Sequence, residues 1–189
     1  MKYAGFWKRF AASFIDAFLT LLPCIFLLWL QTVSRPLAFL SQFLITFIFY
    51  VYEIYFHGSS GQTIGKRSQN IRVVSLDGTA ISWKQAFLRS SLGLGLSILN
   101  MLSVMVALYR IPSEGFSLLG WSELTTKQAQ LAPYNWELFI IMQVWAWSEI
   151  VVMLFNRKRR ALHDFIAGTV VVDESYQALE TETVADAHS

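Results

Sequence analysis

The sequence predicts an all-α polytopic membrane protein with about four transmembrane helices and a small cytoplasmic β-hairpin or sheet insert. Of its 189 residues, 54% are hydrophobic and only 15% are charged, and the mean hydropathy is +0.44. Soluble domains carry about 25% charged residues. Four apolar runs are also present, each long enough to cross about 30 Å of hydrocarbon as a helix. They lie at about 10–30, 37–56, 91–109 and 136–155.

The third run is the weakest of the four predicted spans. It contains serines, glycines and Asn100, so we expect a shortened or tilted helix. Its small residues come in pairs four apart, which favours close contact with another helix, within the chain or between subunits. The pairs are Ser91 with Gly95 and Gly93 with Ser97. We keep Asn100 as a secondary site candidate.

The distribution of positive charge predicts the orientation. Twelve of the 15 Lys and Arg residues fall in the N-terminal segment, the loop between the second and third spans, and the segment after the fourth. Basic residues concentrate on the cytoplasmic side of membrane proteins. We therefore expect a multi-pass protein of the cell membrane with both termini in the cytoplasm. Asp16 interrupts the first apolar run, so we expect a retained helix rather than a cleaved signal peptide.

Residues 57–84 form the predicted cytoplasmic insert of a membrane domain that covers 1–173. The stretch 71–82, with Asp77-Gly78 near its centre, is typical of a β-hairpin, and 169–173 is a second β-branched run. We expect the two to pair, because a lone hairpin is marginal in water. Residues 110–135 are expected to be an external loop with Trp121 as an interfacial anchor. Residues 174–189 are expected to be a disordered acidic tail.

Three carboxylates are expected at similar depth near the cytoplasmic side: Asp16, Glu53 and Glu149. An unpaired charge in hydrocarbon costs roughly 2.5–3.5 kcal/mol on insertion scales, so such residues face a partner, a water-filled cavity or an ion. One interpretation is a cation or proton site. The other is that a residue such as Asp16 pairs with a neighbouring helix and fixes the packing.

A polar stripe follows the second apolar run at helical spacing. Its members are Gln42, Thr46, Tyr50, Glu53 and His57. Such a stripe could line a hydrated path, or it could supply interhelical hydrogen bonds of about 0.6 kcal/mol each. We favour packing for the first three residues and keep His57 as a secondary site candidate.

Other chemistry has little support in the sequence. The stretch 61–67 is similar to a phosphate-binding loop, but Arg67 stands where Ser or Thr is required and no strand precedes it. His163 with Asp164 could be part of a metal site, yet the chain has only three histidines. We keep His163 as a secondary candidate and expect no enzyme activity, cofactor, metal site or nucleic-acid partner.

Three segments, in this order, resemble the RDD family of membrane proteins. They are Ala4–Asp16, Gly61–Lys66 followed by Ile71–Val74, and Arg160–Thr169. The family is named for one Arg and two Asp, which correspond here to Arg9, Asp16 and Asp164. Family members often carry an acid just before the glycine-rich turn; this chain has His57 there, with Glu53 one turn earlier.

The resemblance implies a polytopic membrane domain. Cation/proton exchange has been proposed for some members, and eukaryotic relatives are linked to membrane quality-control assemblies. It also singles out Asp164, which could pair locally with Arg160 or meet Arg9 across the cytoplasmic interface.

Two functional hypotheses follow. The first is a small-cation or proton-coupled transporter, with Asp16, Glu53 and Glu149 as ion ligands and Arg9 with Asp164 as a gate. Four helices rarely enclose a path alone, so this hypothesis requires a homo-oligomer. The second is a non-transporting assembly module that binds lipid or a membrane-protein partner, in which the family-motif charges are structural.

Overall fold

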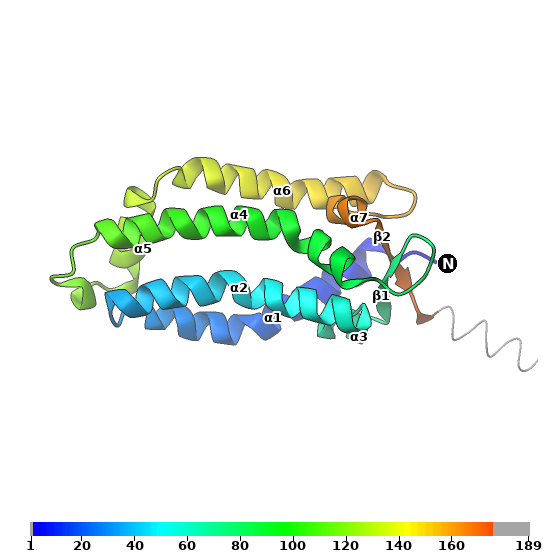
Figure 1. Ribbon diagram of the computed structural model, residues 1–189, viewed down its shortest axis with the longest axis horizontal. Helices are drawn as coiled ribbons and strands as arrows, with labels where there is room; N and C mark the ends of the chain where they lie inside the picture. Colours follow the sequence, from blue (N-terminus) through cyan, green and yellow to red (C-terminus); the bar gives the residue numbers. More distant parts are fainter. Residues whose placement is uncertain (1, 176–189) are drawn as a thin grey trace, which may run out of the picture. The chain divides into compact units, whose positions relative to one another are not determined.

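The computed structural model describes residues 2–175, and its long elements are four apolar helices (Figure 1). All four are long and apolar enough to cross a membrane, which confirms the predicted fold class. They are α1 (Phe6–Leu30), α2 (Arg35–Ser60), α4 (Trp83–Arg110) and α6 (Asn135–Phe155).

The third predicted span is not shortened. Helix α4 has 28 residues and begins at Trp83 rather than at residue 91. Ser82 and Gln85 explain the early start, because each side chain accepts a hydrogen bond from the other residue's backbone N–H, at 3.2 and 2.9 Å. This is a capping box, which fixes a helix start.

Residues 110–135 are more structured than the expected loop. They contain a short 3₁₀ helix (Phe116–Leu118) and helix α5 (Trp121–Leu131). The side chain of Glu123 accepts a weak hydrogen bond from the backbone N–H of Gly120 at 3.4 Å, and Leu124 is fully buried. The turn-forming residues of this segment flank the helix, so a loop over the whole segment was the wrong prediction.

The predicted sheet is present with two strands. Strand β1 (Ile71–Ser75) pairs antiparallel with β2 (Thr169–Asp173), with Ile71 opposite Asp173. The turn at Asp77-Gly78 forms as expected, with Ser75 N–H donating to Thr79 O at 2.9 Å. The second arm of the predicted hairpin is only an isolated bridge at Ala80, because the chain then enters the cap of α4.

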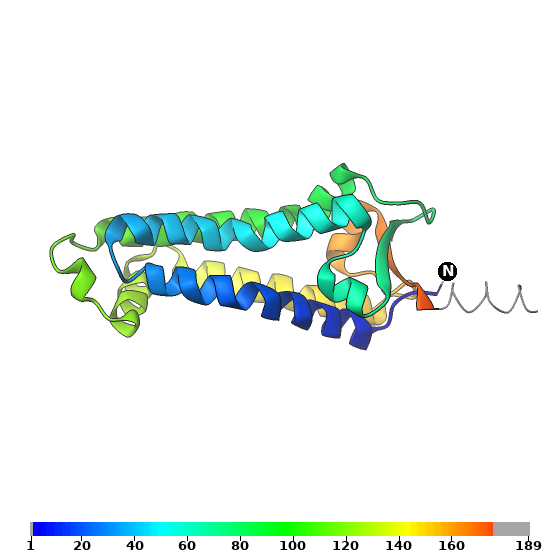
Figure 2. The ribbon, with the colours of Figure 1, turned by 90° about the horizontal axis from the view of Figure 1, so that it is seen from below.

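The described residues divide into two compact units. The first unit comprises 2–18, 52–90 and 147–175, and the second comprises 19–51 and 91–146. Within the first unit lie both strands and two short helices, α3 (Ile64–Ser68) and α7 (Leu162–Ala167), and Figure 2 shows α3 against the start of α1. The buried apolar core of this unit includes Ala4, Ala12, Ile71, Val73, Ile81, Ala86 and Val171.

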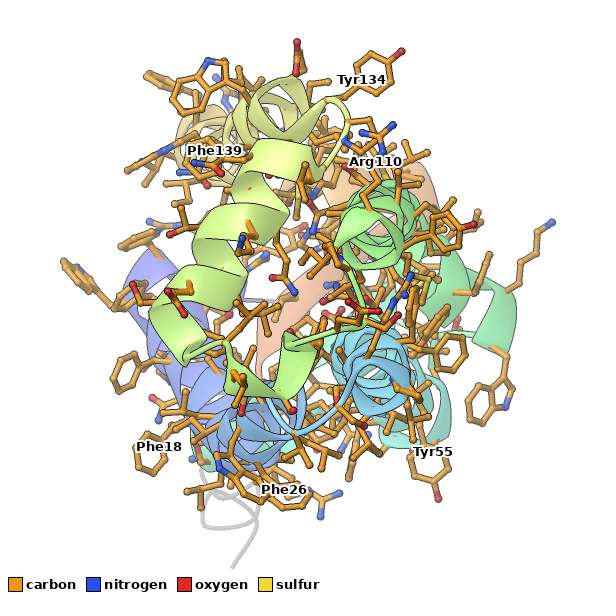
Figure 3. All side chains as sticks on the ribbon, turned by 90° about the vertical axis from the view of Figure 1, so that its left-hand side faces the viewer. Phe18, Phe26, Tyr55, Arg110, Tyr134 and Phe139 are labelled. Atoms are coloured by element: carbon orange, nitrogen blue, oxygen red, sulfur yellow. The ribbon has the colours of Figure 1, made fainter. Side chains whose placement is uncertain are left out.

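The second unit has its own core and an apolar exterior. Its core consists of Ala38, Leu108, Ile111, Phe116 and Leu124. Figure 3 shows Phe26 and Tyr134 pointing away from the helices, and these side chains are 57% and 75% exposed. Apolar side chains exposed on such helices contact lipid in a membrane protein.

The expected disordered tail, 174–189, lies outside the described residues apart from Glu174 and Ser175. Glu174 is anchored to the first unit. Its carboxylate accepts hydrogen bonds from Arg72 and, at 2.8 Å, from the amide of Gln62.

Candidate functional site

Asp16 is buried in the first unit with both carboxylate oxygens bonded. Oδ2 accepts from the Thr63 hydroxyl at 2.5 Å, and Oδ1 accepts from Gly65 N–H and the Tyr52 hydroxyl, each at 2.7 Å. The side chain is only 4% exposed. Asp16 therefore holds the start of α3 against α1, where backbone N–H groups and the helix dipole favour a negative charge.

The glycine-rich turn fits this role of Asp16. A Cβ atom on Gly65 would lie 2.1 Å from the backbone oxygen of Ala12, which no side chain can occupy. Thr63 is the N-cap of α3, and its hydroxyl accepts from Lys66 N–H while it donates to Asp16. The stretch that is similar to a phosphate loop is therefore a docking motif between two helices.

Asp164 is the centre of a second buried cluster and is fully inaccessible to solvent. Oδ2 accepts from Arg9 Nη1 at 2.9 Å and from Ala161 N–H at 3.0 Å. Oδ1 accepts from Arg89 Nη1 and, at 3.3 Å, from the Thr169 hydroxyl. Of the two partners expected for Asp164 from the sequence, the structure therefore has the distant one, Arg9.

The charges around Asp164 favour its ionised form. Burial alone would raise the pKa of the Asp164 carboxyl, but Arg89, His163 and Arg9 outweigh that effect and hold the pKa far below its usual range. Asp164 is therefore an ionised partner of two guanidinium groups. Arg160, the local alternative, donates to the backbone oxygens of Asp164 and Thr169 instead.

Arg89 was missed from the sequence as a site residue. It appeared there as one of the basic residues that set the orientation, because the third span was expected to begin at residue 91. The signal that could have found it is its place on one helical face with Ala86, Ser90 and Gly93, small residues that allow close packing.

A cavity of about 300 Å³ opens beside these clusters, within the first unit. It combines charged and apolar groups. The basic and titratable residues on its wall are Arg9, Lys66, Arg89, His163, Glu53 and Glu149, and the others are Phe6, Phe10, Ser13, Ile150, Met153, Ala161 and Val171. Two of the three predicted carboxylates therefore share one cavity, while Asp16 is not on its wall.

His163 connects the cavity to the Asp164 cluster. Its Nδ1 lies 2.5 Å from Glu149 Oε2, and its backbone N–H donates to Glu149 Oε1 at 3.1 Å. Its Nε2 lies 2.9 Å from Arg89 Nη2. A guanidinium only donates, so Nε2 is the acceptor in this contact. The imidazole is thus held between a carboxylate and a guanidinium.

Lys66 extends from α3 to the cavity and is half-buried. Among the described residues, its ammonium forms no hydrogen bond or ion pair. Burial lowers the pKa of Lys66; Glu53 opposes this shift, and Arg89 adds to it. Glu53, which also lines the cavity, accepts from the Ser90 hydroxyl at 3.0 Å.

The remaining candidates lie elsewhere. His57 is fully buried with Nδ1 3.9 Å from Glu53 Oε1, and within the described part of the chain neither ring nitrogen has a hydrogen-bond partner. Asn100 is half-buried in the second unit. Tyr50, from the polar stripe, shares a 2.8 Å hydrogen bond with Ser97, which supports a packing role. No group of three or more His, Cys, Asp or Glu residues suited to a metal ion occurs in residues 2–175.

Comparisons with known proteins agree with this architecture. A sequence model of the RDD family matches residues 3–168. The chain is 33% identical over 88 residues to the "Uncharacterized protein YckC" of Bacillus subtilis (strain 168). That alignment covers 47% of this chain and 57% of the relative, so it spans little more than half of that protein's length. No solved structure matches the chain.

Proposed function

We propose that this chain, which belongs to the RDD family of membrane proteins, transports a small charged solute together with protons. The observation that carries the proposal is the cavity of the first unit, whose wall combines Glu149, His163 and Lys66. Coupled transporters use carboxylate and imidazole groups of this kind as proton relays.

Glu149 and His163 would be the proton-coupling pair. The imidazole is held between Glu149 and Arg89, with Nδ1 on the side of the acid and Nε2 on the side of the guanidinium. A proton on Nε2 would face the guanidinium of Arg89, so it requires that contact to open. Protonation of the pair is in this way linked to the position of Arg89, which also binds Asp164.

The other features of the transport proposal concern the whole assembly. We propose that the protein lies in the cell membrane with both termini in the cytoplasm, since most Lys and Arg residues fall in the two terminal segments and in the loop between the second and third spans. We also propose a homo-oligomer, because the apolar helices bury few of their side chains within the chain. Cross-linking in native membranes would test this, and a monomer would contradict it.

Among substrates, a monovalent cation is one candidate, with Glu53 as the oxygen ligand on the cavity wall. Glu53 keeps one carboxylate oxygen free of Ser90, which donates to the other. Asp16 is a poor ligand for this cation, because its oxygens accept three hydrogen bonds within the packing anchor.

A second candidate function is a non-transporting assembly module that binds lipid or a membrane-protein partner. It is favoured by the family-motif charges, because Arg9, Asp16 and Asp164 all contribute to bonds inside the first unit. In that case the motif defines a fold, and the cavity is not part of a transport path.

A flux assay separates these functions. Purified protein is reconstituted in liposomes with a pH-sensitive dye inside, and Na⁺, K⁺ or inorganic phosphate is added outside in separate runs, against protein-free liposomes. We expect at least one addition to move protons in the wild type. Glu149→Gln keeps an oxygen for the His163 N–H but cannot carry the proton, so the flux is lost.

Glu137→Gln is the matched control, since Glu137 is an exposed acid in the first turn of the same helix. We expect flux close to that of the wild type in this variant. Absence of flux with all three additions, or equal flux in Glu149→Gln and the wild type, contradicts the transport proposal and favours the assembly module.

A further inference from the structure

Arg9 has an unused edge at the cavity. Its Nη1 donates to Asp164, whereas Nε and Nη2 are buried and without a hydrogen-bond partner. These two nitrogens lie on the same edge of the planar guanidinium, the edge that binds a carboxylate or phosphate with two parallel hydrogen bonds. Arg9 is only 9% exposed and is part of the cavity wall. A buried donor pair without an acceptor is costly, so this edge calls for a ligand.

Two further cations have spare donors at the same cavity. Arg89 is 5% exposed, and its Nε has no partner among the described residues. The Lys66 ammonium forms no bond with any described residue either. A carboxylate or phosphate oxygen placed here would accept charge-assisted hydrogen bonds, which are stronger than neutral ones.

Each acidic group nearby is engaged through at least one oxygen. Glu149 is bound by His163, and Glu53 accepts from Ser90. Outside the cavity wall, Asp164 neutralises one charge of the two arginines, and Asp16 is held in the α3 anchor. Among the described residues, each acid on the wall keeps one oxygen without a hydrogen bond, Oε2 of Glu149 and Oε1 of Glu53. The free donors of Arg9, Arg89 and Lys66 outnumber these two acceptors.

We propose that this cavity is an oxyanion site, in which the free edge of Arg9 and the ammonium of Lys66 bind the carboxylate or phosphate group of a small molecule or of a lipid. The apolar part of the wall, from Phe6, Phe10 and Ile150, accommodates the uncharged part of the ligand. That this ligand is the transported substrate rests on the proposed function; the binding site does not.

The test measures binding without transport. Protein in a non-ionic detergent is titrated calorimetrically with inorganic phosphate and, separately, with acetate. Lys66→Gln removes a cation that forms no bond in the structure, so it leaves the fold intact. Loss of one charged hydrogen bond weakens binding by roughly 10- to 100-fold. Arg67→Gln, at an exposed neighbour on the same helix, removes the same charge and changes affinity by no more than about twofold.

Arg9→Lys is a second variant that tests the free edge. A lysine can still pair with Asp164, but it lacks the second edge of the guanidinium. We expect the folded protein to accumulate and to bind the probes at least about tenfold more weakly.

A second arm identifies the source of the oxyanion. The protein is extracted from vesicles of phosphatidylglycerol and phosphatidylethanolamine, washed, and its retained phospholipid is counted by phosphorus analysis. Binding of free phosphate or acetate assigns the site to a soluble small molecule. Retained phospholipid that is lost in Lys66→Gln but not in Arg67→Gln assigns it to a lipid headgroup.

The inference is overturned if neither probe nor phospholipid binds, or if Lys66→Gln behaves like Arg67→Gln. Proton flux without oxyanion binding overturns this inference and leaves the transport proposal standing. Oxyanion binding without proton flux supports this inference and contradicts the transport proposal.

Discussion

Replacing Asp16 is the perturbation with the most informative energetics. Its carboxylate accepts three hydrogen bonds, from Thr63, Gly65 and Tyr52, in a site with 4% exposure. Asp16→Ala leaves those three donors without an acceptor, at about 1–3 kcal/mol each. The total, about 3–9 kcal/mol, is comparable with the whole stability of about 5–15 kcal/mol for a folded domain. We expect this variant not to accumulate.

Asp16→Asn is much milder. The amide oxygen can still accept from Gly65 and Tyr52, while the amide NH₂ donates to the Thr63 hydroxyl, which becomes an acceptor. Neutral hydrogen bonds are about half as strong as charge-assisted ones, so each of the three weakens by roughly 1 kcal/mol. We expect a loss of about 3 kcal/mol, and a folded protein with a lower unfolding temperature.

The assay is thermal unfolding of the detergent-solubilised protein, followed by gel filtration, together with the yield from the membrane fraction. Glu114→Gln is the control, since Glu114 is exposed and lies in the second unit. The order of stability should be wild type and control, then Asn, then Ala. If Asp16→Ala unfolds at the wild-type temperature, the anchor role of Asp16 is refuted.

Three other predictions follow from the same structure. Gly65→Ala lowers the free energy of unfolding by about 1–3 kcal/mol or more, because the added methyl group overpacks against α1. Gly95 has open space around it, so Gly95→Ala raises the free energy of unfolding by up to about 1 kcal/mol through helix propensity. Unfolding temperatures of the two variants check this, and equal values contradict it. Arg89→Met removes a partner of buried Asp164 and costs roughly 3 kcal/mol or more, a loss that the membrane yield reports and a normal yield refutes. Phosphate binding weakens as pH rises through the pKa of Lys66, which lies below its ordinary 10.5, because the ammonium loses its proton there; titration calorimetry across alkaline pH measures the decline, and a pH-independent affinity contradicts it.

The fold was largely predictable because a membrane imposes it. Twenty apolar residues have few alternatives to a spanning helix in hydrocarbon. Strand pairing between 71–75 and 169–173 was also predictable, since both are β-branched runs in segments that the charge pattern assigns to the same side. Helix α5 was not, because its cap depends on a contact between Gly120 and Glu123 inside a segment with many turn residues.

The candidate site was only partly predictable. Glu53 and Glu149 share a cavity, as expected from their depth, but Asp16 does not line it. The difference lies in the tertiary position of α3, which brings Thr63 and Gly65 to Asp16 as hydrogen-bond donors, with Tyr52 of α2 as the third. Lys66 is another such case, because nothing in a sequence tells which of two adjacent basic residues faces a cavity.

The central claim is that Asp16 holds the fold whereas the cavity residues carry the transport. The most direct test compares Asp16→Asn with Glu149→Gln in the liposome flux assay, with flux normalised to the amount of folded protein. The account predicts that Asp16→Asn retains proton flux per folded molecule and that Glu149→Gln loses it. The reverse result, a folded but inactive Asp16→Asn with an active Glu149→Gln, would contradict the account and return Asp16 to the transport path.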